Sequence, residues 1–375
     1  ICACLVGSEM CIRDRYKVMV MKKGFWIILC MFFIPPVTFA GNMKLHYDRP
    51  AEYFEEALVI GNGTMGATLY GGVKKDKISF NDITLWTGEP ESENSSPDAF
   101  NTIPEIRALL DNEDYQGADK AQYKVQGHYS ENYQPLGTLT IEYLDDTVGI
   151  SDYHRWLDIG NATARTQYLK GGKLFTSDYF ASAPDSVIVI RLKSENKEGI
   201  YALLSFDSPL PHSSQVADNE ISVEGYAAYH SFPVYYKAED KHRYDPERGI
   251  HFKTLVRVLS VDGRVKNRYS DSRIEIDGST EVLILVANVT SFNGFDKDPV
   301  KEGRNYRSHV EKRMKCAVGK TYDALREAHI RDYKYYFDRV KLDLGNTDDD
   351  IAALPTDKQL LFYTDCKQQL SLIHI

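Results

Sequence analysis

Short apolar runs, bounded by clusters of Gly, Asn, Asp and Lys, recur along the chain from Thr138 onward. Most alternate with a period of two, which is typical of strands with one buried face. The runs that start at Ser186 and Glu281 are continuously apolar and predict central strands buried on both faces. The predicted strands cover residues 138–143, 186–192, 201–207, 220–224, 254–260, 273–277 and 281–288. Such a series favours a mainly β fold built as a large antiparallel β-sandwich.

Helical patterns appear in three places. Residues 104–122 predict a helical insertion with Pro104 in its first turn. A second helix is predicted over 321–340, where one apolar stripe joins Tyr322, Leu325, His329, Tyr333, Phe337 and Val340. A third begins near Thr356, which with Gln359 has the spacing of a capping box. The chain therefore changes from strands to a helical linker near Pro299.

The two ends of the chain are related at the level of DNA. Residues 10–15 can be encoded by ATG TGT ATA AGA GAC AGN, and the reverse complement of those codons reads as residues 370–375. This relation resembles a transposon adapter used in sequencing libraries. We therefore exclude residues 1–18 and 370–375 from the fold, and we expect the reading frame to continue beyond Gln369.

A secretory signal is predicted over residues 19–40, with the start at Met19 or Met21. Two lysines precede an apolar run over 24–34, and small residues before Ala40 suit a cleavage site. The run is shorter than the ~20 residues that a spanning helix needs. We expect a secreted or periplasmic protein whose mature chain has no stable membrane span.

Composition and motifs narrow the chemistry. The formal net charge of -9 argues against nucleic acid as a partner. Beyond the signal only Cys316 and Cys366 remain, too few for a disulfide framework. The histidines have no metal-ligand spacing and no nucleophile elbow occurs, so we predict no metal, no cofactor and no catalytic nucleophile in this chain.

Residues 55–90 are the most distinctive stretch. Residues 61–66 match the glycine spacing of a dinucleotide-binding loop, but no βαβ pattern follows, so two hairpins at Gly61 to Gly63 and Gly71-Gly72 are predicted instead. Residues 81–88 look like a strand end that delivers Trp86 to a loop. Two interpretations stay open: Trp86 contacts a ligand, or it anchors the core or a domain interface.

The chain resembles the N-terminal region of glycoside hydrolase family 95, mainly α-L-fucosidases with some α-L-galactosidases. The resemblance covers nearly all of 44–360, with Val59 and Asp82 as departures from the usual proline and glutamate. The motifs that carry it are ALVIGNG at 57–63, GG at 71–72, FNDITLWTG at 80–88, YQPLG at 133–137, YHRWLD at 153–158, FASAPD at 180–185 and HIRDY at 329–333.

This resemblance implies a domain order: a sandwich over 43–298, a helical linker over 299–353, and over 354–369 the first residues of a truncated helical-barrel catalytic domain. It also implies an inverting enzyme whose carboxylates stand far enough apart to admit a water. Those catalytic residues belong to the barrel, so none is assigned here.

The substrate- or interface-adjacent candidates are Asn81, Trp86 and Gln134, and the implied partner is a fucosylated glycan. Two alternatives stay open: a non-catalytic carbohydrate-binding module, and the N-terminal domain of a related sugar phosphorylase.

Overall fold

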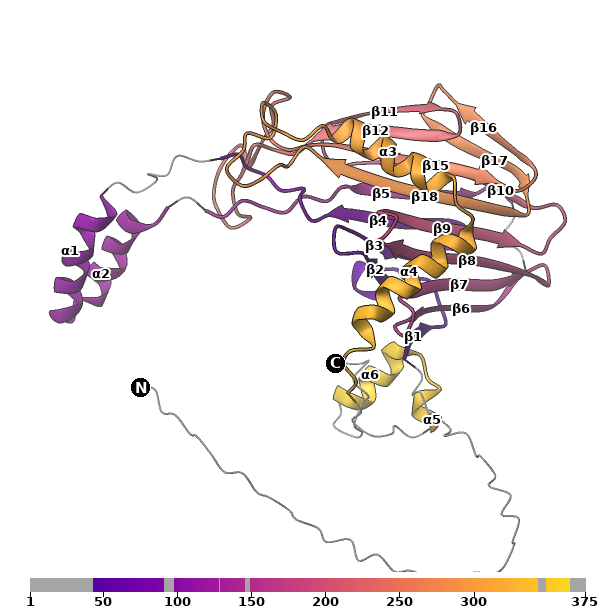
Figure 1. Cartoon of the computed structure of the whole chain (residues 1–375). Helices are drawn as coiled ribbons and strands as arrows, with labels where there is room; N and C mark the ends of the chain where they lie inside the picture. Colours follow the sequence, from indigo (N-terminus) through magenta and orange to yellow (C-terminus); the bar gives the residue numbers. More distant parts are fainter. Residues whose placement is uncertain (1–42, 91–97, 128, 146–148, 343–348, 365–375) are drawn as a thin grey trace, which may run out of the picture. The chain divides into compact units, whose positions relative to one another are not determined.

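In the computed structural model, two large antiparallel sheets pack face to face (Figure 1). The nine-stranded sheet has the order β1 (Lys44–Tyr47), β6 (Ile150–Asp158), β7 (Thr163–Lys170), β8 (Lys173–Ser182), β9 (Val187–Ser194), β18 (Glu281–Thr290), β15 (His251–Ser260), β12 (Glu220–Tyr226) and β11 (His212–Ala217). The seven-stranded sheet has the order β16 (Arg264–Arg268), β17 (Arg273–Ser279), β10 (Ile200–Asp207), β5 (Gly137–Tyr143), β4 (Lys75–Asp82), β3 (Met65–Leu69) and β2 (Leu58–Gly61). The predicted β-sandwich is confirmed.

The structure describes residues 43–90, 98–127, 129–145, 149–342 and 349–364. The described residues all belong to one compact unit. The predicted adapter segments at 1–18 and 370–375, the signal at 19–40 and residues 365–369 lie outside the described residues.

The strands β9 and β18 lie side by side in the middle of the nine-stranded sheet, as their apolar sequences predicted. Ile190 and Ile284 face the seven-stranded sheet and belong to the core between the sheets. Their neighbours Val189 and Leu285 point the other way, into a second core under the C-terminal helices. Because side chains alternate across a strand, burial on both faces requires the continuous apolar runs seen in the sequence.

Tight turns and several short elements connect the strands of the sandwich. Gly61 to Gly63 and Gly71-Gly72 form the predicted turns between β2, β3 and β4. The short elements are η1 (Phe54–Glu56), η2 (Tyr123–Val125), and the hairpin of β13 (His230–Ser231) with β14 (His242–Arg243).

The predictions for residues 104–122 and for the helix at Thr356 need correction. Residues 104–122 are not one helix but α1 (Ala99–Asp111) and α2 (Tyr115–Gln122), and Pro104 lies inside α1, beyond its first turn. The chain turns between them at Glu113, whose φ of 59° is left-handed. The helix α6 (Thr356–Thr364) is present, but the capping box is not: Thr356 Oγ1 accepts from His46 N at 2.9 Å, and Gln359 Nε2 donates to Leu354 O. Thr356 therefore ties α6 to β1, and α5 (Asp349–Ala352) precedes it.

The helical linker packs on the outer face of the nine-stranded sheet. Val310 and Met314 of α3 (Tyr306–Val318) and Leu325 of α4 (Tyr322–Phe337) are buried in the second core. The predicted stripe of α4 continues as stacked rings, His329 on Phe180 of β8 and Tyr333 on Phe337, with centroids 5.0 Å apart in each pair. Val340 lies past the helix end and is 81% exposed, so its predicted place in the stripe is wrong.

Val310→Ala should lower the free energy of unfolding by about 2 kcal/mol, because it removes buried methyl groups and leaves a cavity under α3. Lys312→Ala, on the exposed side of the same helix, is the matched control and should change it by less than about 0.5 kcal/mol. Urea denaturation of both variants measures this. Equal effects would mean that α3 does not pack on the sheet.

Candidate functional site

A cleft of about 330 Å³ opens where β4 runs out into the loop that carries Trp86. We call it the Trp86 cleft; its lining residues come from four separate parts of the chain and are Ile83, Trp86, Thr87, Gly88, Glu89, Pro90, Glu131, Ile250, Phe292, Gly294, Phe295, Lys297 and Pro299. The volume lies at the lower end of the range of small-ligand sites, ~300 to 1,000 Å³.

Trp86 is held in place but not buried. The fully buried Leu85 anchors the loop, and the next residue, Trp86, keeps 43% of its surface exposed. Its Nε1 donates to Ile83 O at 3.0 Å, and its ring packs edge to face with Tyr133 at a centroid distance of 5.5 Å. This exposure excludes Trp86 as a core anchor, and its contacts fix the indole in one orientation.

Tyr133 supports Trp86 from behind. Burial raises the pKa of its hydroxyl to about 12, and that hydroxyl hydrogen-bonds to the side chain of Asn81 on β4. Asn81 therefore reaches Trp86 only through Tyr133 and does not line the cleft. Gln134 is 7% exposed, and its backbone N–H donates to Leu85 O at 2.9 Å, so it supports the loop from inside.

Glu131 is the polar centre of the cleft. Its Oε1 lies 2.7 Å from His230 Nδ1, and its Oε2 accepts from Ser231 N at 3.1 Å and from Thr87 Oγ1. Charge-assisted bonds of this kind are among the stronger hydrogen bonds in proteins. One carboxylate thus joins the Trp86 loop to the β13 hairpin and is itself held still.

The other charges of the cleft also have partners. Arg248 makes a two-pronged ion pair with Glu89, and its guanidinium carbon lies 3.7 Å from the ring centre of Tyr229. Lys297 Nζ lies 3.7 Å from carboxylate oxygens of both Asp296 and Glu302. The lining therefore carries charge without a strong excess of either sign.

Of the three candidates from the sequence, the structure places only Trp86 in the cleft. Glu131 and Phe295 lie in loops and His230 in the short strand β13, and none was predicted because none belongs to a recognisable motif. The fold alone brings these loops together.

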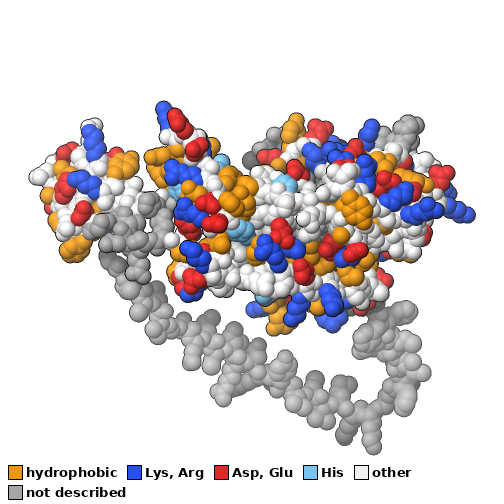
Figure 2. Space-filling view, turned by 90° about the horizontal axis from the view of Figure 1, so that it is seen from above, with side chains coloured by type: hydrophobic (Ala, Val, Ile, Leu, Met, Phe, Trp, Pro, Cys, Tyr) orange, Lys and Arg blue, Asp and Glu red, His pale blue; other side chains and the backbone are white. Residues whose placement is uncertain are grey.

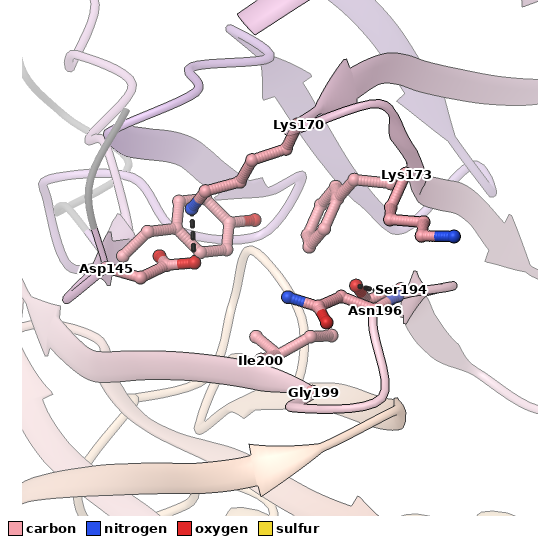
Figure 3. Close-up of a pocket in the computed structure, with 9 residues that line it drawn as sticks. Asp145, Lys170, Lys173, Ser194, Asn196, Gly199 and Ile200 are labelled. Carbon is pink, nitrogen blue, oxygen red and sulfur yellow. Dashed lines mark hydrogen bonds and ion pairs between the residues drawn. The ribbon is translucent and has the colours of Figure 1, made fainter. Parts of the chain in front are cut away.

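A second cavity lies at another edge of the sandwich and has a volume of about 20 Å³, room for about one water molecule. Lys170 reaches toward Asp145 and pairs with it, whereas Lys173 points away from them (Figure 3). This cavity is too small for a substrate.

Two absences hold for the described part of the chain. No group of three or more His, Cys, Asp or Glu side chains there is arranged to hold a metal ion. No helix within the described ranges is long and apolar enough to cross a membrane. On the face seen in Figure 2, acidic and basic side chains lie interspersed.

Comparison with known proteins places the chain in a family. The family described as glycosyl hydrolase family 65, N-terminal domain, matches residues 45–294, which include nearly all of the sandwich. The chain belongs to this family. Family membership agrees with a glycosidase N-terminal domain. The matching family is glycosyl hydrolase family 65, whereas the sequence resemblance pointed to family 95.

Curated relatives carry fucosidase names. The chain is 29% identical over 319 residues to Alpha-L-fucosidase 2 of Arabidopsis thaliana, covering 81% of this chain and 37% of that protein. It is 27% identical to Probable alpha-fucosidase A of Aspergillus niger, covering 90% and 42%. The chain thus spans about two fifths of the length of the curated relatives it matches.

Among solved structures, a putative kojibiose phosphorylase from the human microbiome is similar with a TM-score of 0.45 at 9% identity, covering 78% of this chain and 38% of that one.

Proposed function

We propose that the full-length protein is a secreted, inverting exo-glycosidase of the family 95 type, which hydrolyses terminal α-L-fucosyl or α-L-galactosyl residues of glycans. This chain is its N-terminal sandwich and linker and contains no catalytic residue. The carrying observation is the 29% identity to an α-L-fucosidase over 81% of this chain but only 37% of that relative. We assign the catalytic barrel to the part of the relative that the alignment does not cover.

The contacts of the carboxylates in the Trp86 cleft support the proposal that this chain is not catalytic. Inversion needs an acid and a base about 6.5 to 9.5 Å apart with a water between base and sugar. Glu89 is occupied by Arg248, and Glu131 by His230, Ser231 and Thr87. Both serve to hold loops together.

Asp76 is the other carboxyl with a notable environment. Burial raises its pKa to about 6, a value that would suit a glycosidase acid. It is 1% exposed between the two sheets, however, where it accepts from Gly72 N at 2.9 Å and from Tyr179 Oη at 2.8 Å. No glycan can reach it there, so its role is structural.

The linker supports a scaffold role. His329 Nε2 lies 3.0 Å from Ala162 O, and Tyr333 Oη donates to Ile159 O at 2.7 Å, so α4 is fixed to the turn between β6 and β7. A helix held in this way gives the following domain a defined starting position.

Two proteins test this proposal: residues 41–375, and the product of the uninterrupted gene without its signal. We expect the longer protein to release nitrophenol from 4-nitrophenyl α-L-fucoside or α-L-galactoside, and the shorter one to give only the rate of buffer. Turnover by residues 41–375 would overturn the assignment of catalysis to the missing part.

A further inference from the structure

We propose that the Trp86 cleft binds a neutral sugar unit of a glycan. This goes beyond the proposed function and does not rest on it, since it concerns binding by this chain alone. Of the two interpretations of Trp86 that the sequence left open, it adopts contact with a ligand.

Exposed aromatic rings are the first argument. Trp86 is 43% exposed and Phe295 is 89% exposed, and both line the same cleft. Their rings offer apolar surface against which the C–H face of a pyranose can pack. Trp86 is already fixed by Ile83 O and Tyr133, so little side-chain freedom is lost on binding.

A fixed hydrogen-bond acceptor is the second argument. The carboxylate of Glu131 has about four lone-pair positions, and the protein occupies three of them through His230, Ser231 and Thr87. The remaining one can accept from a sugar hydroxyl. An aromatic surface beside an oriented carboxylate is a suitable combination for a polyhydroxylated ligand.

Charge pairing defines the ligand further. The ion pair of Arg248 with Glu89, and the position of Lys297 between Asp296 and Glu302, leave no unpaired cation among the described residues that line the cleft. An anionic ligand such as a uronate or a phosphate would lose its hydration without gaining a free positive partner. The cleft therefore favours a neutral sugar.

Calorimetric titration of residues 41–375 tests the proposal, with 2′-fucosyllactose, lactose and methyl α-L-fucoside as neutral probes and glucuronic acid and inorganic phosphate as anionic ones. We expect at least one neutral probe to bind more tightly than both anions. Trp86→Ala and Phe295→Ala should each weaken this binding by about tenfold or more. Tyr269→Ala, a similarly exposed aromatic outside the cleft, should leave it unchanged.

The variants distinguish loss of sugar binding from loss of the fold. Because Phe295 is almost fully exposed, its variant should keep the fold, and thermal melting of every variant verifies this. No heat from any neutral probe at millimolar concentration, or equal affinities for Phe295→Ala and Tyr269→Ala, would overturn the sugar site. Neither result bears on whether the longer protein hydrolyses fucosides.

Discussion

Replacing Arg155 with alanine should lower the free energy of unfolding by about 3 to 5 kcal/mol, the range of large core truncations. Arg155 is 1% exposed, although arginine is rarely buried to this degree. Its Nε donates to Arg49 O and its Nη1 to Glu56 O, each at 2.8 Å, and its guanidinium carbon lies 4.0 Å from the ring centre of Tyr47. The side chain thus holds the irregular segment before β2 against β6.

The loss has two parts. Alanine leaves a cavity where a large side chain stood, and it removes the donors of two backbone carbonyls. Arg155→Lys should be intermediate, because a single ammonium cannot reproduce the planar fork that serves both carbonyls.

Urea denaturation of residues 41–375 at pH 7 measures the effect, with Arg268→Ala as the control. Arg268 is an arginine with 44% of its side chain exposed and should cost less than about 1 kcal/mol. If Arg155→Ala were as mild as the control, the buried contacts would not exist in solution.

Asp76→Asn should stabilise the protein at pH 8 by up to about 3 kcal/mol. Burial raises the folded-state pKa of Asp76 from 3.8 to about 6, so the folded chain holds this proton more tightly than the unfolded chain. Between these values the folded state binds more protons, and stability falls as the pH rises. Above about pH 6 the full penalty of a buried charge remains, and a shift of about two units corresponds to about 3 kcal/mol.

Asparagine removes this dependence. Its amide oxygen can still accept from Gly72 N, and its NH₂ group can donate to the Tyr179 hydroxyl. Between pH 4 and pH 8 the free energy of unfolding of the variant should therefore fall less with rising pH than that of the wild type. Asp277→Asn, at a partly exposed carboxyl whose pKa is lowered by Lys266, should not show this gain at pH 8. A variant less stable than wild type at pH 8 would contradict the assignment.

The central strands of the fold could be predicted from the sequence. Burial on both faces makes β9 and β18 continuously apolar, and burial on one face makes β12 alternate, so all three were predicted. The strands β6 and β7 were not, because both carry many polar residues that stay partly exposed near one end of the sheet. Their place is decided by pairing with neighbours, which a local pattern does not contain.

Fewer residues of the Trp86 cleft could be predicted from the sequence. Trp86 could be selected because an aromatic residue after a strand end is a local feature. Glu131 and Phe295 stand 164 residues apart in the chain and meet only in the folded cleft. The error at 104–122 has a different cause: the apolar positions Ile106, Leu109 and Leu110 all lie in α1, and they do not show the left-handed turn at Glu113 that divides the segment.

The stereochemistry of the product tests the account most directly. Proton NMR of 2′-fucosyllactose hydrolysis by the product of the uninterrupted gene, recorded in the first minutes, distinguishes the anomers of the released sugar. We predict that β-L-fucose appears first and that its formation needs no phosphate. Release of α-L-fucose first, or of fucose 1-phosphate only when phosphate is added, would contradict the proposal that this sandwich belongs to an inverting fucosidase.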